Sequence, residues 1–281
     1  MGNSKIPWLK NPDGSPGKTW PLAEGCTKVS TGCLNCCAER MYKRWHPDGD
    51  FCKVRLKPEH LDDPLHWKKP QRVLVDFMFD LFHPDVPNGF IFGAFMRMVK
   101  ANQHTYFILT KRPDRMLEWI TTKWMVDFEG VHHDDLILSN VWMGVSVEDQ
   151  KTGDERIPLL LQTPTSVRFV SYEPALGSLE LTTPGKFCFL NPSFLVAYPT
   201  GTFPYEIIFR ERKKPGLDWV ICGCESGPGA RPMDIEWARS VRDQCQAAQV
   251  PFFFKQKMVD GKLIHMPELD GQIWAQFPEV K

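Results

Sequence analysis

The feature that most constrains the fold is a repeated alternation of short apolar runs with amphipathic helical patterns. Eight runs have β-strand character, and several are continuously apolar, as parallel strands buried on both faces require. These runs are residues 18–20, 54–57, 73–77, 106–109, 141–145, 167–170, 219–222 and 252–254. Helical patterns lie between several of them, at residues 90–101, 114–123, 153–162 and 234–248.

Eight strands that alternate with helices over about 250 residues predict a (β/α)8 barrel. We therefore expect an α/β protein in which residues 1–281 form a single TIM-type barrel domain, closed or else partial and open. A Pro- and aromatic-rich insertion at about 177–215 stands where one helix would be, and the crossover at 58–70 is short. An open doubly wound sheet is the alternative architecture.

The charge balance and the length of the apolar runs argue against two classes of protein, a globally basic nucleic-acid binder and a membrane-spanning protein. The 34 Lys and Arg residues match the 34 Asp and Glu residues, so no global positive field attracts nucleic acid, although a local basic groove is compatible with this balance. No apolar run approaches the ~20 residues that cross a bilayer, and the first residues lack a signal-type apolar stretch. We expect no membrane partner and a cytoplasmic location, where the nine cysteines would be reduced.

Four of these cysteines crowd into the segment GCTKVSTGCLNCCAERM, as Cys26, Cys33, Cys36 and Cys37. The first three read C-x6-C-x2-C on a loop rich in Gly, Thr and Ser, directly after the first predicted strand. Three thiolates on a loop suit an iron–sulfur cluster. The alternatives are buried structural cysteines and a zinc site, whose usual fourth ligand would be His46, Cys52 or Cys37.

Polar side chains also follow the predicted strands at the ends where a TIM-type barrel carries its active site. They are Asp76, Asp80, Thr110, Lys111, Arg112, Ser146, Glu148, Asp149, Ser171, Glu173, Glu225, Ser226, Lys255 and Gln256. The cysteine loop would open on the same rim. This convergence predicts an active site there, and the alternative for each single residue is a solvated loop position.

A cysteine triplet after the first strand of a barrel resembles the radical S-adenosylmethionine superfamily, and most closely its spore-photoproduct-lyase-like branch. The fragments DLFHPDVP, LTKRPDR and GVSVED support this resemblance. The whole chain is also similar to a group of phage and prophage proteins without assigned activity, which share GCTKVS-x-GC-x-x-C, LTKRP, GVSVEDQ, RFVS-x-EP and ESGPGARPM.

The chain departs from the superfamily pattern at several positions. The first cysteine gap holds six residues instead of three, and Asn35 replaces an aromatic residue. Cys37 stands where the phage group has Tyr, so Cys36 and Cys37 compete as the third ligand. GCE at 223–225 looks like the superfamily's GGE element with Cys224 substituted.

The resemblance implies a mechanism and a set of site residues. Cys26, Cys33 and Cys36 would ligate a [4Fe–4S] cluster whose fourth iron binds S-adenosylmethionine, and one-electron cleavage would yield a 5′-deoxyadenosyl radical that abstracts hydrogen from the substrate. Cys224, as a hydrogen donor, and Glu225 would be catalytic, with core packing as the alternative for Cys224. The expected cofactor-binding residues are Asp80, Lys111, Arg112, Ser146, Glu148 and Glu173. The expected substrate-binding residues are Ser226, Arg231 and Lys255.

The resemblance also implies partners. An electron donor of flavodoxin or ferredoxin type would reduce the cluster, and a phage setting in the host cytoplasm favours a nucleotide or a modified DNA base as substrate. Basic runs at 68–70, 110–115 and 210–215 would flank such a substrate, unless they are solvated loops. The non-catalytic alternative is a zinc-stabilised nucleic-acid-binding or adaptor protein.

Overall fold

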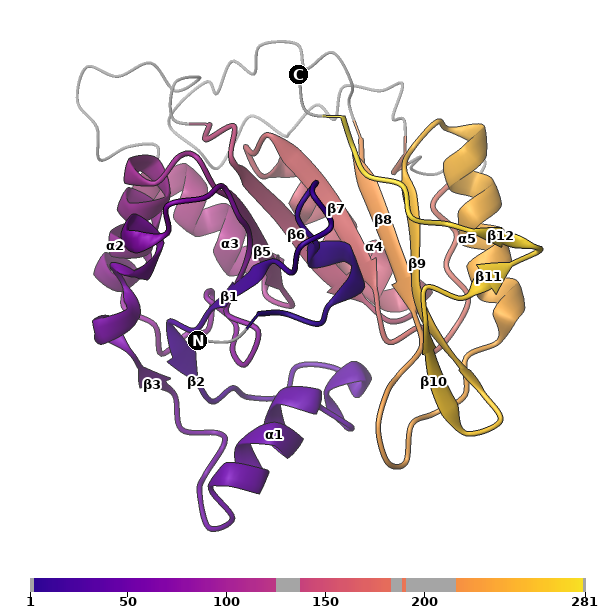
Figure 1. Cartoon of the computed structure of the whole chain (residues 1–281), viewed down its shortest axis with the longest axis horizontal. Coiled ribbons are helices and arrows are strands. Elements are labelled where there is room, and N and C mark those ends of the chain that lie inside the picture. Colours follow the sequence, from indigo (N-terminus) through magenta and orange to yellow (C-terminus); the bar gives the residue numbers. More distant parts are fainter. Residues whose placement is uncertain (1–2, 125–136, 183–188, 191–215, 280–281) are drawn as a thin grey trace, which may run out of the picture.

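An eight-stranded sheet forms the centre of the computed structural model, which describes residues 3–124, 137–182, 189–190 and 216–279 (Figure 1). The strands follow one another across the sheet in chain order. They are β1 (Lys18–Trp20), β4 (Arg72–Val75), β5 (Thr105–Thr110), β6 (Val141–Val147), β7 (Val167–Tyr172), β8 (Trp219–Gly223), β9 (Phe252–Val259) and β10 (Lys262–His265). All neighbours are parallel except β9 and β10, which form an antiparallel pair.

The sheet curls into a half-barrel instead of closing on itself (Figure 1). β1 and β10 are its two edges, and among the described strands they do not pair with each other. The predicted α/β class and the partial, open form of the barrel are therefore confirmed.

One predicted strand, residues 54–57, is not part of this sheet. Its central pair forms β3 (Arg55–Leu56), which pairs antiparallel with β2 (Ala23–Glu24) in a separate two-stranded ribbon. Both residues of β3 are only half-buried, whereas the parallel strands of the main sheet are covered on both faces. The eighth place in the sheet belongs to β10, which the sequence pattern did not reveal.

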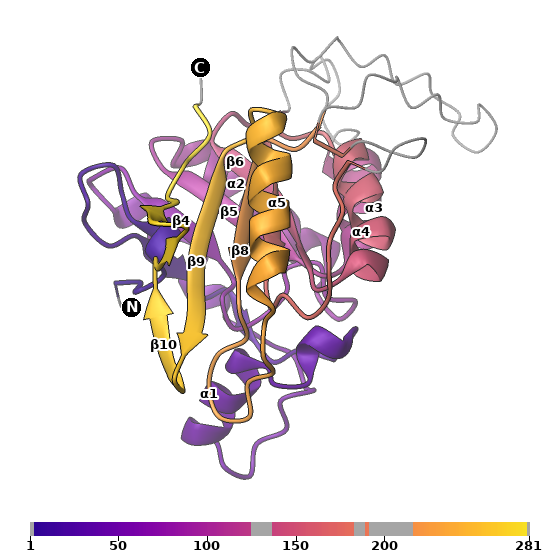
Figure 2. The same cartoon turned by 90° about the vertical axis from the view of Figure 1, so that its right-hand side faces the viewer.

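The helices α2 (Asn88–Lys100), α3 (Pro113–Trp119), α4 (Gln150–Gln162) and α5 (Ile235–Ala247) lie on the convex side of the sheet (Figures 1 and 2). They share one large apolar core with the outward-facing side chains of the strands. α5 falls within the helix predicted at 234–248 and buries Ala238, Val241 and Cys245 against this core. Most of the insertion expected at 177–215 lies outside the described residues. In the described part of the chain, no helix has the length and apolarity to span a membrane.

A second apolar cluster fills the concave side at the amino-terminal halves of the strands. It is mainly aromatic, with Phe107, Trp142, Phe169 and Trp219 among its members. The short helix Pro7–Leu9 adds Trp8, whose ring centroid lies 5.6 Å from that of Phe107. The concave positions further along the strands are polar, so the half-barrel has an apolar floor and a polar mouth.

The crossover from β1 to β4 carries the cysteines. After β2 the chain forms the cysteine loop (residues 25–36), a short helix Thr31–Cys33 within it, and α1 (Cys37–Trp45). It then returns through β3 and two short helices, Pro58–His60 and Asp63–His66. α1 lies at the end of the molecule toward which β9 points (Figure 2).

Candidate functional site

The cysteine loop lies across the carboxyl ends of the strands, where the sequence predicted an active site. Hydrogen bonds join it to three separate parts of that rim. Ser30 Oγ donates to Glu148 Oε1 at 3.0 Å, after β6. Arg112, after β5, donates to the carbonyl of Thr27 at 2.9 Å, and Asn35 Nδ2 donates to Glu225 Oε2 at 2.8 Å, after β8.

Glu148 is the most deeply buried charged residue of this rim, with 0% of its surface exposed. Lys111 Nζ lies 2.6 Å and Arg156 Nη1 3.2 Å from its carboxylate, and these two cations compensate a charge that would otherwise be costly to bury. A Cβ on Gly32 would stand 2.5 Å from Glu148 Oε1, so glycine is required there for the loop to approach this closely. Glu148 was predicted to bind a cofactor, and the structure places it as the anchor of the loop.

Asp80 and Arg112 form a second buried connection to the loop. Asp80 accepts from Thr110 Oγ1 at 2.7 Å and from Arg112 Nη1 at 2.9 Å. Arg112 Nη2 donates to Thr27 Oγ1 at 3.0 Å, while Nη1 lies 3.6 Å from Cys26 Sγ. Asp80 therefore orients a guanidinium whose other contacts are with the cysteine loop and a thiol.

The three predicted ligand thiols are partly buried neighbours with different acidities. Burial raises the pKa of Cys26 to about 11 and also raises that of Cys36. Burial acts in the same direction on Cys33, but the charge of Lys111 and hydrogen bonds from the loop backbone outweigh it and lower the Cys33 pKa. Cys33 interacts electrostatically with both other thiols. It is the thiol most readily converted to the thiolate that binds metal.

The four clustered cysteines are not equivalent. Cys36 is half-buried immediately before α1, whereas Cys37 is exposed and its Sγ contacts Met41 Sδ at 3.9 Å. Of these two cysteines, Cys36 is the less exposed and interacts electrostatically with Cys33. Within the described ranges, no three His, Cys, Asp or Glu side chains stand close enough together to hold a metal ion.

The segment after β8 clamps the other side of the cysteine loop. Arg231 pairs with Glu225 at 2.5 Å and also donates to the carbonyl of Thr31 at 3.0 Å. Arg40 of α1 donates to the carbonyl of Ser226 at 2.6 Å. Burial would raise the pKa of Glu225, but hydrogen bonds from Arg231 and Asn35 lower it to about 2. Glu225, Ser226 and Arg231, predicted for catalysis and substrate, are thus engaged in holding this loop.

A third polar group lies on the concave side at the ends of β7, β8 and β9. Lys255 Nζ is 2.5 Å from Glu173 Oε1, which also accepts from Gln256 Nε2 at 3.0 Å. Cys224 is buried beside this group, and burial raises its pKa to about 11. Ser146 and Ser171 are register partners on β6 and β7 and are also buried.

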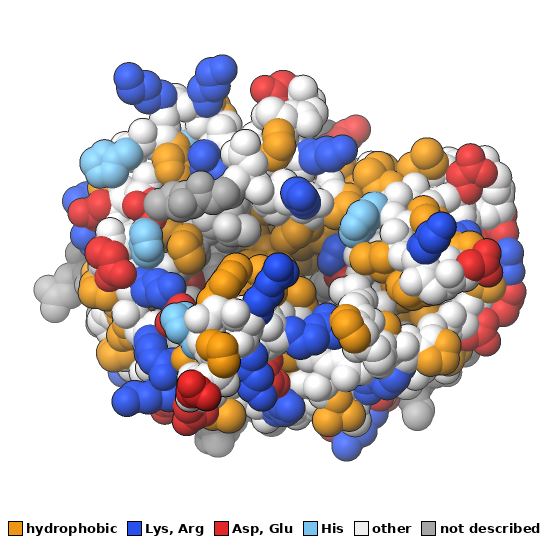
Figure 3. All heavy atoms as spheres, turned by 60° about the horizontal axis from the view of Figure 1, so that its bottom comes forward, with side chains coloured by type: hydrophobic (Ala, Val, Ile, Leu, Met, Phe, Trp, Pro, Cys, Tyr) orange, Lys and Arg blue, Asp and Glu red, His pale blue; other side chains and the backbone are white. Residues whose placement is uncertain are grey.

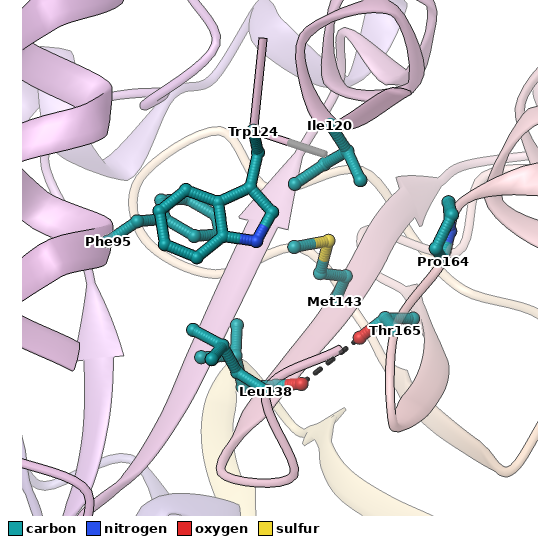
Figure 4. A pocket seen from close by; sticks show the side chains of 8 residues that line it. Phe95, Ile120, Trp124, Leu138, Met143, Pro164 and Thr165 are labelled. Carbon is teal, nitrogen blue, oxygen red and sulfur yellow. Dashed lines mark hydrogen bonds between the residues drawn. The ribbon is translucent and has the colours of Figure 1, made fainter. Parts of the chain in front are cut away.

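The surface at this end of the molecule is hollowed (Figure 3). Hydrophobic side chains are visible in the depth of the hollow, and several Lys and Arg side chains surround it. A different cavity lies on the convex side, between Phe95, Trp124, Leu138 and Met143 (Figure 4). Its volume is about 10 Å³, which is no more than a water molecule needs. A larger cavity of about 170 Å³ lies beside α2 and α3, lined by Asn88, Arg115, Glu118 and Trp119.

Sequence reasoning missed several residues that hold the site together. Arg156 lies on the inward face of α4 and donates to the carbonyl of Ser146 at 2.7 Å. His83 is buried, and its Nε2 is 2.8 Å from Thr27 Oγ1. The detectable signals were a charged residue on the apolar face of an amphipathic helix and a histidine inside DLFHPDVP.

Fold and site together define an α/β half-barrel protein with a cysteine loop held over its polar mouth. The chain belongs to the family described as protein of unknown function (DUF5131), whose model matches residues 3–278. No curated protein and no solved structure was found to match the chain.

Proposed function

We propose that the protein is a radical S-adenosylmethionine enzyme with a partial TIM-type barrel, in which Cys26, Cys33 and Cys36 hold a [4Fe–4S] cluster. The observation that carries the proposal is the position of the cysteine loop. Its three neighbouring thiols stand over the polar mouth of a parallel half-barrel, beside the cations Lys111 and Arg112.

The donor set fits such a cluster better than a closed metal site. Three thiols come from one loop, and three ligands leave one iron free for a further ligand. Because the thiols are not gathered at ligation distance, the proposal includes a tightening of the loop on binding. A reduced cluster of this kind supplies one electron for cleavage of S-adenosylmethionine to methionine and a 5′-deoxyadenosyl radical.

The residues around the loop then act by binding, orientation and exclusion of water. Lys111 favours the thiolate of Cys33 and lies near the mouth, where it attracts the carboxylate of the nucleotide's methionine part. Arg112 has the same role and is oriented by Asp80. Ser146 offers a hydroxyl on the concave face, and the aromatic floor below it excludes water from the reacting atoms.

The proposal extends to partners. The substrate is a nucleotide or a DNA base, and a flavodoxin- or ferredoxin-type donor reduces the cluster. The Lys and Arg side chains around the hollow suit a phosphate-bearing substrate (Figure 3).

The first test is metal content after anaerobic reconstitution with iron and sulfide. The wild-type chain should bind about four irons and show the absorption and, once reduced, the electron paramagnetic resonance of a [4Fe–4S] cluster, perturbed by added S-adenosylmethionine. Cys33→Ala should lose the cluster, whereas Cys37→Ala should keep it. Cys52→Ala is the matched control, because Cys52 is also exposed.

Two other outcomes would count against the proposed cluster or against its third ligand. A colourless protein with about one zinc that unfolds with chelators supports the zinc-stabilised alternative. Loss of iron in Cys37→Ala but not in Cys36→Ala would show that the third ligand has been assigned to the wrong cysteine.

A further inference from the structure

Three polar side chains, one directly after β7 and two within β9, take no part in holding the cysteine loop. Lys255 and Glu173 form an ion pair at 2.5 Å, with 16% and 18% of their side chains exposed. Gln256 Nε2 donates both to Glu173 Oε1 and to the carbonyl of Cys224. Within the described chain, no hydrogen bond joins these three side chains to residues 25–45.

This group has hydrogen-bonding capacity that the protein does not use. In the described part of the chain, no protein group bonds to Glu173 Oε2 or Gln256 Oε1, and Lys255 uses one of its three donors. The hydroxyls of Ser146 and Ser171 also have no protein partner there, although the two residues are only 6% and 2% exposed. These polar atoms are therefore available to bind a ligand or ordered water.

The group packs against Gly223 and lies beside the aromatic cluster of the concave side. Gly223 lies opposite the group, and a Cβ there would be 3.3 Å from Gln256 Cγ and 3.5 Å from Glu173 Cδ. Below, on the same concave face, are the rings of Phe169, Trp142 and Trp219. The polar group therefore borders an aromatic floor.

We propose that Glu173, Lys255 and Gln256, with the hydroxyls of Ser146 and Ser171, form a substrate subsite that binds the lactam edge of a nucleobase. A lactam presents an N–H beside a carbonyl, which matches a carboxylate acceptor beside an ammonium donor. The ion pair is neutral as a unit, so it does not select a phosphate. The inference rests on the proposed function, because it places the base where hydrogen abstraction would take place. It also reassigns Glu173 and Ser146 from the cofactor to the substrate and keeps Lys255 at the substrate.

The test is nucleoside selectivity, measured on the full chain by saturation-transfer NMR and calorimetry, before and after cluster reconstitution. Guanosine and thymidine, which have a lactam edge, should bind at least tenfold more tightly than adenosine and cytidine, which lack one. Glycine and inorganic phosphate are the probes for a zwitterion site and an anion site. Tighter binding of either probe, equal binding of all four nucleosides, or binding of none would overturn the inference.

Two variants assign the selectivity to these residues. Lys255→Met and Glu173→Gln should each weaken guanosine or thymidine binding by about tenfold, as expected for loss of one hydrogen bond to a charged group. Lys262→Met, at an exposed position on β10, is the control. Unchanged binding in both variants would overturn the assignment. Because selectivity is measured without the cluster too, a failure of the radical chemistry would leave this result intact and distinguishable.

Discussion

A single buried carboxylate, Glu148, does much to determine where the cysteine loop lies. It accepts from Ser30 of the loop, faces Gly32 at close range, and is neutralised by Lys111 and Arg156. Lys111 in turn lowers the pKa of Cys33. The position of the loop and the acidity of its central thiol therefore depend on one ion-pair network.

Glu148→Gln should loosen this network. The amide keeps the shape but leaves Lys111 and Arg156 without their buried counter-charge, so we expect a loss of about 3 kcal/mol in the free energy of unfolding. Hydrogen exchange in residues 26–36 should also become faster. Urea unfolding and exchange mass spectrometry measure both effects.

The control for this variant is Glu39→Gln. Among the described residues Glu39 pairs with the exposed Lys28 and Lys43 alone, so its loss should change stability by no more than about 0.5 kcal/mol. If Glu148→Gln behaves like Glu39→Gln, Glu148 does not anchor the loop.

For single residues, the sequence predicted which side chains lie near one another but not which partners they bind. Asp80, Lys111, Arg112 and Glu148 were expected on one rim, and they do lie there, because parallel strands end at one edge of a sheet. Their partners are set by contacts between distant segments, such as Glu148 with Arg156 and Ser30, and no local pattern encodes those.

Between elements, the key contact joins the cysteine loop and α1 to the segment after β8. Glu225 is its centre, with hydrogen bonds from Asn35 and Arg231, and Arg40 bonds the adjacent backbone. A Cβ on Gly227 would stand 2.3 Å from the Arg40 guanidinium, and the positive φ of Gly227 adds a second reason for glycine there.

This contact should be lost in acid. The pKa of Glu225 is about 2 in the folded protein and 4.5 ordinarily, so its stabilising effect is complete above pH 4.5 and disappears as pH falls through about 2. We expect Glu225→Gln to be less stable than wild type by on the order of 2 kcal/mol at pH 6, since the partner Arg231 is partly exposed.

The difference in the free energy of unfolding between wild type and Glu225→Gln should shrink toward zero as the pH falls from 4.5 to about 2. Urea unfolding of both proteins at each pH measures it, and Glu155→Gln, at an exposed surface pair, controls for general charge effects. A difference that is constant with pH would mean that the ionised carboxylate is not what holds the contact.

Among the elements, long buried strands were predictable and short ones were not. β5 to β9 appear as apolar runs because both their faces are covered. β3 consists of Arg55 and Leu56 alone, both half-buried, and it pairs with β2 in a separate ribbon, so the short apolar pattern at 54–57 did not reveal its place.

In the molecule as a whole, the residues that stabilise the open half-barrel lie apart from the residues proposed to take part in chemistry. The aromatic cluster around Trp219 fills the amino-terminal half of the concave side, and the polar groups and the cysteine loop occupy the carboxyl ends. The sequence predicted the polar residues at the carboxyl ends of the strands, but not the aromatic cluster at the other half. It did not decide between a closed and an open barrel, because closure depends on whether β1 meets the far edge of the sheet.

The central claim is that the cysteine loop supports radical chemistry at this mouth. The most direct measurement is 5′-deoxyadenosine, quantified by mass spectrometry after the anaerobically reconstituted protein is incubated with S-adenosylmethionine and dithionite. We expect 5′-deoxyadenosine to accumulate with time for the wild-type protein and none to form with Cys33→Ala. A wild-type protein that carries its four irons and still yields no 5′-deoxyadenosine would contradict it.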